Sequence, residues 1–294
     1  MKRIFIQVVA WLTMNANIAG FWGRILDRLG KTPKAKIANL ITASNTIVEE
    51  TTKSVCVPGL NCYSCPGSTG ACPMGSIQHF IAVHQVPWFA AGSMLAISTV
   101  IGRMPCGMLC PFGFLQDLLY KIRTVKLKLP HWTHYIKFLS LVIVAGVVVY
   151  LTNETWFCKL CPAGIFGAGI PQILLDPQLM RILGWLFAVK AGILGLTLVF
   201  SIFTKRPFCR VCALGAIFSL GNKISFLRLR VDTEKCNQCD MCLRVCPMEL
   251  KPYENPQSSA CIRCLECTRC ELIDFVPAYM IGKKTAQLPE VTHD

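Results

Sequence analysis

The final fifth of the chain contains eight cysteines in two closely spaced runs. The first run is Cys236, Cys239, Cys242 and Cys246, and the second is Cys261, Cys264, Cys267 and Cys270. Interleaved runs of this kind are the ligand pattern for two [4Fe–4S] clusters, in which the fourth cysteine of each run binds the other run's cluster. The spacing therefore predicts a first cluster on Cys236, Cys239, Cys242 and Cys270 and a second on Cys246, Cys261, Cys264 and Cys267.

The chemistry that this pattern indicates is one-electron transfer. Disulfides are one alternative, but eight cysteines this close together would strain against one another. Zinc is another, but structural zinc sites use two separated pairs of ligands rather than three cysteines at every third residue. Because iron-bound thiolates must stay reduced, we expect this segment to face a cytoplasm-like compartment.

A second cysteine pattern recurs through the rest of the chain. Each copy has a cysteine, then proline (alanine in the last copy), then a glycine two residues further on. The copies are Cys72-Pro73-Met74-Gly75, Cys110-Pro111-Phe112-Gly113, Cys161-Pro162-Ala163-Gly164 and Cys212-Ala213-Leu214-Gly215. The last three are 51 residues apart, and each has a companion cysteine upstream, namely Cys106, Cys158 and Cys209. A fixed period predicts a structural repeat, in which we expect proline to stop regular backbone and glycine to let the chain turn beside a metal.

Hydropathy predicts the elements that position these cysteines. The chain has 294 residues, a mean hydropathy of +0.48, and 53% hydrophobic but only 16% charged residues. Four apolar stretches approach the roughly 20 residues that cross a bilayer, near 4–22, 84–103, 135–152 and 182–203. The net charge of +14 would suggest nucleic acid in a soluble protein. Here the basic residues flank apolar stretches, as membrane orientation requires, so we expect a lipid bilayer and no nucleic acid as partner.

The predicted fold is mostly α: a four-helix transmembrane bundle with cysteine-bearing loops, plus a small C-terminal two-cluster ferredoxin domain of α+β type. The boundaries are 1–225 for the membrane domain, 226–275 for the ferredoxin domain and 276–294 for a tail. The positive-inside rule predicts a multi-pass protein of the cytoplasmic (inner) membrane of a prokaryote, with both termini and the ferredoxin domain cytoplasmic. The start Met1-Lys2-Arg3 also fits the basic end of a signal peptide, and Lys190 inside the fourth span is expected to face the bundle interior or an interface.

Alternate copies of the repeat then fall on the same side of the membrane. Four cysteines at the inner side, Cys106, Cys110, Cys209 and Cys212, make a complete site for a cubane cluster or a tetrahedral metal. At the outer side, Cys158 and Cys161 are joined by two of four first-loop cysteines, Cys56, Cys62, Cys65 and Cys72. The repeat favours Cys65 with Cys72, or Cys62 with Cys65, and disulfides are the alternative there. We expect the two sites to lie roughly 30 Å apart, because a spanning helix separates them.

Other polar residues carry weaker signals. His79 and His84, ahead of the second span, are candidates for a quinone or haem site, and an ordinary interfacial position is the alternative. Gln116 and Asp117 follow the inner motif and are expected to touch a partner or to lie on a solvated helix face.

The motif from Cys106 to Gly113, the motif from Cys158 to Gly164 and the double C-terminal run resemble the NapH-type membrane polyferredoxins, a group similar to NosR and CcoG proteins. The resemblance implies four spans and an electron-transfer subunit, rather than a complete enzyme, between the quinone pool and a partner oxidoreductase. It implies two [4Fe–4S] clusters in the ferredoxin domain, one or two more in the membrane domain, and a quinone. The chain departs from the family at Ala213 and at Glu271, which replaces the proline after Cys270. Two alternatives are a CcoG-like metal-handling or maturation protein and a structural anchor for a soluble redox complex.

Overall fold

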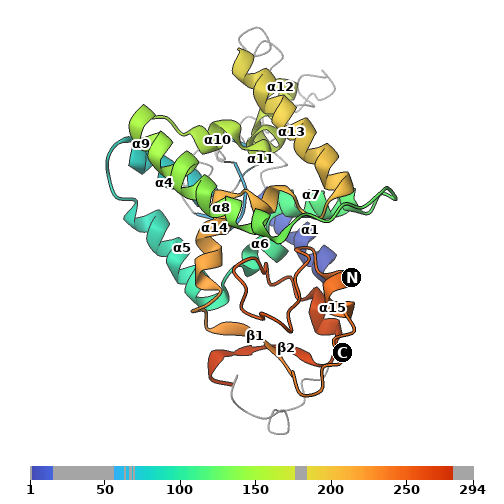
Figure 1. The fold of residues 1–294 in the computed structure, drawn as a ribbon. Helices are drawn as coiled ribbons and strands as arrows, with labels where there is room; N and C mark the ends of the chain where they lie inside the picture. The colour runs from blue at the N-terminus through green and yellow to red at the C-terminus, as the bar shows by residue number, and fades with distance from the viewer. Residues whose placement is uncertain are drawn as a thin grey trace, which may run out of the picture.

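The computed structural model describes residues 2–15, 56–62, 64–65, 68, 70–175 and 184–280 (Figure 1). Most of the basic loop after the first predicted span, the start of the fourth predicted span and most of the predicted tail lie outside these residues. All 18 cysteines lie within them.

The described chain is mostly helical, as predicted. The first helices are α1 (Lys2–Met14), α4 (Pro73–Ala82), α5 (Trp88–Ile101), α6 (Met104–Met108) and α7 (Pro111–Tyr120). A continuous helical segment follows, made of η1 (His131–Tyr135), α8 (Ile136–Leu139), η2 (Ser140–Val147) and α9 (Val148–Thr152). The next elements are α10 (Trp156–Leu160), α11 (Pro162–Gly164), η3 (Ile165–Gly169), α12 (Ile170–Leu175), α13 (Trp185–Phe203), η5 (Phe208–Arg210) and α14 (Ala213–Gly221).

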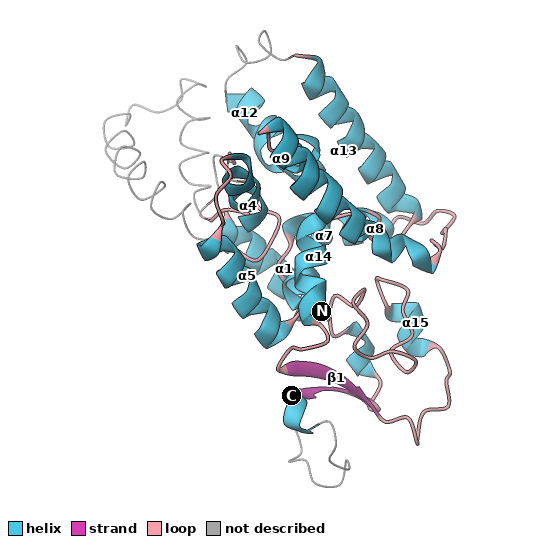
Figure 2. Ribbon diagram, turned by 60° about the vertical axis from the view of Figure 1, so that its left-hand side comes forward, coloured by secondary structure: helices cyan, strands magenta, loops and turns pink. Residues whose placement is uncertain are grey.

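The C-terminal part is built around a two-stranded sheet. Its elements are β1 (Leu227–Val231), α15 (Met241–Val245), η6 (Glu266–Arg269), β2 (Ile273–Pro277) and η7 (Ala278–Met280). The strands are antiparallel, with Leu227 opposite Pro277 and Val231 opposite Ile273. Figure 2 shows this sheet at one end of the molecule, with the cysteine-rich loops between it and the helices. The sheet therefore closes the segment that carries the eight C-terminal cysteines.

Only some helices of the predicted four-span bundle are long enough to cross a membrane. Among the described residues, two helices are long and apolar enough to cross a membrane: His131–Thr152 with 22 residues and Trp185–Phe203 with 19. Helices α1 and α5 have 13 and 14 residues. Helix α5 ends at Gly102, which has φ +61, and a Cβ there would lie 2.5 Å from Asn222 Oδ1. Only glycine fits that conformation and that close approach, so the helix ends there, two residues before the predicted end of the second span. At its other end α5 begins at Trp88, four residues after the predicted start.

The Cys-Pro copies begin helices, which differs from the expected role of proline as a stop. Four cysteines, Cys72, Cys110, Cys161 and Cys212, are the N-cap residues of α4, α7, α11 and α14. Their backbone is nearly the same, with φ between −63 and −71 and ψ between 114 and 124. Proline follows in three copies, where its fixed φ suits the first helical residue and its missing N–H costs nothing. Each repeated thiol thus sits at a helix N-terminus, where the helix dipole favours an anion.

Candidate metal centres

The two C-terminal cysteine runs fold into the same backbone shape. In each run, the second and fourth residues after the first cysteine adopt positive φ: Gln238 and Asp240 in the first run, Arg263 and Leu265 in the second, with φ between 48 and 58. A left-handed conformation is costly for residues such as leucine. A short helix then follows in both runs, α15 and η6. The shared pattern curls each loop around its cysteines.

The structure places these eight cysteines around two cavities. One cavity is lined by Cys246, Cys261, Cys264 and Cys267, and a second is lined by Cys236, Cys239, Cys242 and Cys270. Cys270, the last cysteine of the second run, thus lines the cavity of the first three cysteines of the first run, although no proline follows it. Burial raises the pKa of the Cys261 thiol to about 12, so a positive partner such as iron would be needed to hold it as a thiolate. We refer to the two sets as the distal set (with Cys236) and the proximal set (with Cys246).

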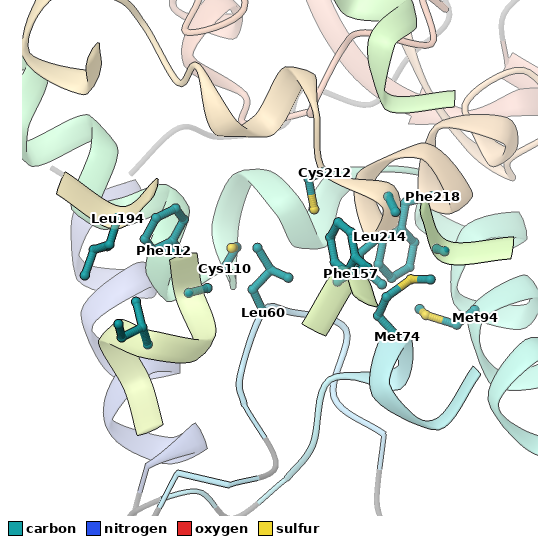
Figure 3. Packing of buried hydrophobic residues seen from close by; sticks show 14 residues of the cluster. Leu60, Met74, Met94, Cys110, Phe112, Phe157, Leu194, Cys212, Leu214 and Phe218 are labelled. Carbon is teal, nitrogen blue, oxygen red and sulfur yellow. The ribbon is translucent and has the colours of Figure 1, made fainter. Parts of the chain in front are cut away.

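The four predicted inner cysteines also lie together, and we call them the inner set. Cys106 and Cys209 interact electrostatically with both Cys110 and Cys212. Cys110 and Cys212 belong to one buried cluster (Figure 3), and Cys106 packs against it. Helices α6, α7 and α14 and the turn η5 supply these thiols.

At the outer side, the structure differs from both pairs that the repeat favours. Cys62, Cys72, Cys158 and Cys161 line one cavity of about 600 Å³, and Cys72 interacts electrostatically with the other three. We call these four the outer set. Cys65 is buried elsewhere, with its Sγ 3.6 Å from Asn15 Oδ1. Cys56 forms a β-bridge with Ala71. Four sets of four therefore leave Cys56 and Cys65 as the remaining two of 18 cysteines.

The expected separation of roughly 30 Å between the outer and inner sets is wrong. Cys161 and Cys212 interact electrostatically. Cys212 belongs to a hydrophobic cluster with Phe157 and Leu60 (Figure 3), and Cys161 packs against that cluster. The cause is that α10 and α11 pack against α13 along its length, where Leu194 joins the same core. The outer loop therefore folds back into the helical core instead of staying at the end of the span, as buried irregular backbone can.

Buried cations around the inner set fit an anionic group there. Arg103 and Lys137 are 1% and 0% exposed, and neither forms an ion pair with a carboxylate of the described chain. Arg103 Nε is buried without a partner. Lys137 interacts electrostatically with Cys106, Cys209 and Cys212, and Lys190 does so with Cys158. Since buried charges need counter-charges, thiolates with their iron and sulfide would supply them.

The cysteine sets do not have the geometry of a site for a single metal ion. No group of three or more His, Cys, Asp or Glu side chains in the described ranges converges as one metal ion would need. Zinc requires four donors within about 2.0–2.3 Å of one point. A [4Fe–4S] cubane is held by four cysteines, each on a different iron, so its ligands stand around a cavity. No disulfide joins any of the cysteines.

Arginine side chains fasten the C-terminal part to the helical core. Arg206 is fully buried and makes a bidentate pair with Asp117 at 2.7 and 2.6 Å, while its Nη1 donates to the carbonyl of Cys106 at 2.9 Å. Arg210 pairs with Glu249 at 2.7 Å. Arg3 of α1 pairs with Asp117 and lies 3.6 Å from Glu266. The ion pairs thus tie α1, α7 and the loop after α13 to the proximal set.

Several of these residues were missed by the sequence analysis, or a different position was predicted for them. Asp117 was expected at a partner or solvated face, but it forms the ion pairs above. Gln116, expected at the same face, is 0% exposed and its amide contacts Cys209. The signal for Gln116 was present: Gln78 and Gln116 each stand six residues after a repeat cysteine.

The two predicted histidine sites are unlike each other. His79 and Phe80 line the outer cavity together with the four outer cysteines. His84 instead packs edge-on against Tyr150, with ring centres 4.7 Å apart. Of the two, His79 is the one placed beside the outer set.

Comparison with known proteins identifies the repeat. The family described as "4Fe-4S binding domain" matches residues 83–130, 136–174 and 182–231. The uncharacterized protein MJ0750 of Methanocaldococcus jannaschii is 31% identical over 209 residues, which cover 67% of this chain and 81% of that protein. The chain belongs to this 4Fe-4S binding family. The matched segments contain the inner set and Cys158 and Cys161 of the outer set, and end before Cys236.

Two further relatives agree with that family. The regulatory protein NosR of Stutzerimonas stutzeri is 29% identical over 173 residues, or 55% of this chain and 22% of NosR. YccM of Escherichia coli, whose name describes an electron transport protein, is 24% identical over 212 residues, or 66% of this chain and 56% of YccM. No solved structure matches the chain. The chain is thus an iron–sulfur protein of electron-transfer type, and the narrower NapH-type assignment stays a prediction.

Proposed function

We propose that this chain is a membrane-bound electron-transfer subunit with four [4Fe–4S] centres, on the outer, inner, proximal and distal cysteine sets. When bound, such clusters carry single electrons. The protein's part is to hold each set of thiols at a fixed place and to exclude water from it. In this proposal the helices His131–Thr152 and Trp185–Phe203 cross the inner membrane, and the C-terminal domain lies in the cytoplasm.

One observation carries the proposal: the four sets are packed against one another in an unbroken order. The outer and inner sets share a hydrophobic cluster that contains Cys161 and Cys212. The inner and proximal sets share a second cluster, in which Cys106 and Cys209 pack with Cys264. In a third cluster, Cys267 of the proximal set packs with Cys242 of the distal set. Each set therefore shares a hydrophobic cluster with the next.

The ends of this series suggest where electrons enter and leave. The outer cavity, lined by the four outer cysteines, also has His79 and Phe80 on its wall. A quinone that docks beside the outer centre would meet this imidazole, and the redox change of a quinone moves protons. At the other end, Cys239 is exposed, which supports docking of a partner oxidoreductase at the distal set. In this proposal, electrons therefore pass between the quinone pool and a partner subunit, in either direction.

Iron and acid-labile sulfide per chain, measured on anaerobically purified protein, test the number of centres. About sixteen irons, at four per centre, are expected. About eight would confine iron to the distal and proximal sets and overturn the proposal for the helical domain. Cys212→Ser should then lower the count by about four, while Cys65→Ser should leave it unchanged.

Reduction by a quinol tests the entry point. Added quinol should reduce the centres of vesicle-reconstituted protein, and His79→Ala should slow this step while His84→Ala does not. Reduction of a bound metal ion without quinol would instead support the metal-handling alternative. A partner complex that stays active after loss of single ligands would support the anchor alternative.

A further inference from the structure

Two buried glutamines contact sulfur at equivalent places in the repeat. Gln78 Nε2 lies 3.2 Å from Cys158 Sγ, and its Oε1 accepts a hydrogen bond from the Phe157 N–H at 3.0 Å. Gln116 Nε2 lies 3.8 Å from Cys209 Sγ, and its Oε1 accepts from the Phe208 N–H at 3.1 Å. Both side chains are 0% exposed.

The equivalence extends to every partner of the two amides. Each glutamine stands six residues after an N-cap cysteine, Cys72 or Cys110. Each also donates to a carbonyl of its own helix, four residues back. Each reaches the companion cysteine of the copy that completes its site: copy three for Gln78 and copy four for Gln116. The same arrangement thus occurs twice, once at the outer set and once at the inner set.

The hydrogen bonds fix which end of each amide faces the sulfur. A backbone N–H can only donate, so the amide oxygen must point to Phe157 or Phe208. The NH₂ group is then directed at the thiol, which carries a negative charge when it binds iron. A buried donor held from both sides stays in place when the charge at the sulfur changes.

We propose that Gln78 and Gln116 are positioning residues that raise the reduction potentials of the outer and inner centres, each through one N–H···S hydrogen bond. Hydrogen bonds to the sulfurs are one of the factors that set cluster potentials, and a donor stabilises the more negative, reduced state. The proposal rests on the proposed function, since it needs a centre on each set. Gln78, with the shorter contact, has the larger effect.

Redox titration followed by EPR on the full chain tests the proposal with two pairs of variants. Gln78→Glu and Gln116→Glu keep an oxygen for the backbone N–H and remove the donor to sulfur. Gln78→Leu and Gln116→Leu remove the donor without adding charge. Each variant should lower the potential of one centre only, with about a tenfold change in its ratio of reduced to oxidised form at fixed potential, or 59 mV for one electron. Gln7→Leu is the control, because Gln7 is equally buried but donates to the Gly107 carbonyl.

The outcomes separate this inference from the proposed function. If the wild-type protein held no iron in its helical domain, the outer and inner centres would not exist, and the proposed function itself would be overturned. Centres that are present but keep their potentials in the glutamine variants would overturn the inference alone. So would loss of iron without any change in potential, because the amide would then only hold the loop, and so would an equal shift of both centres by one variant.

Discussion

At the scale of single residues, the pair between Arg206 and Asp117 is the contact whose loss should cost most. Arg206 is 0% exposed and donates hydrogen bonds to both carboxylate oxygens of Asp117. Asp117→Asn would leave that guanidinium buried without a counter-charge, which costs about 3–5 kcal/mol. We expect a clear fall in the thermal unfolding midpoint of the purified protein. Glu254→Gln, at a surface pair with Lys251, is the control and should change stability by less than about 1 kcal/mol.

The same pair predicts how stability depends on pH. Burial opposes ionisation of Asp117, but the charge and hydrogen bonds of Arg206, with help from Arg3, outweigh it and lower the pKa below its ordinary value of 3.8. Because the folded pKa is the lower one, this stabilisation is present above about pH 4 and is lost as the pH falls through the lowered value. Unfolding midpoints measured from pH 6 to pH 2 should show that loss in the wild type. An equal acid dependence in Asp117→Asn would contradict it.

Gly107 determines how closely the inner set approaches the proximal set. A Cβ at this position would lie 2.4 Å from the Ile262 carbonyl oxygen and 3.2 Å from the Cys264 Cα. Backbone cannot move aside as a flexible side chain can, so Gly107→Ala should push the C-terminal domain away. We expect weaker magnetic coupling between the two centres in EPR and faster proteolysis between α14 and β1. Gly195→Ala is the matched control, since nothing lies within 4 Å of its Cβ.

At the scale of elements, the prolines after the N-cap cysteines should tune stability and not geometry. Ala213 already occupies the proline position in the fourth copy, and Cys212 still has φ −63 and ψ 117. Pro111→Ala should therefore keep the iron content and lower stability by only about 0.4–1 kcal/mol, through the greater freedom of the unfolded chain. Ala216→Pro, inside α14, should cost about 3 kcal/mol. Loss of iron in Pro111→Ala would contradict this view of the motif.

The elements also show which predictions the sequence could support. Fixed spacing led to the grouping of Cys106, Cys110, Cys209 and Cys212, because copies related by the repeat occupy related places in the fold. The sequence could not predict that Cys62 and not Cys65 joins the outer set, because the first copy of the repeat is expanded and its spacing does not fix the loop conformation. Hydropathy likewise gave apolar stretches without the break at Gly102. Hydropathy also did not indicate that α10 and α11 return to the core. The predicted separation of roughly 30 Å between the outer and inner sets was wrong for that reason.

At the scale of the whole molecule, the inner set lies between the outer set and the C-terminal domain: Cys161 shares a hydrophobic cluster with Cys212, and Cys209 shares another with Cys264. This arrangement makes the inner set a point of interruption. Cys209→Ser, which leaves all other cysteines in place, should stop electrons supplied at the outer end from reaching the distal centre. Stopped-flow reduction with EPR of rapidly frozen samples would follow each centre in turn.

The matched variant for this experiment is Cys56→Ser, which removes a thiol outside all four sets. It should leave the order and rate of reduction unchanged. In Cys209→Ser, the outer centre should still be reduced, and the distal centre should still respond to a soluble reductant that reaches Cys239. Unchanged transfer from the outer end in Cys209→Ser would mean that electrons bypass the inner set. The contiguous packing of the four sets would then be a feature of stability and not of conduction.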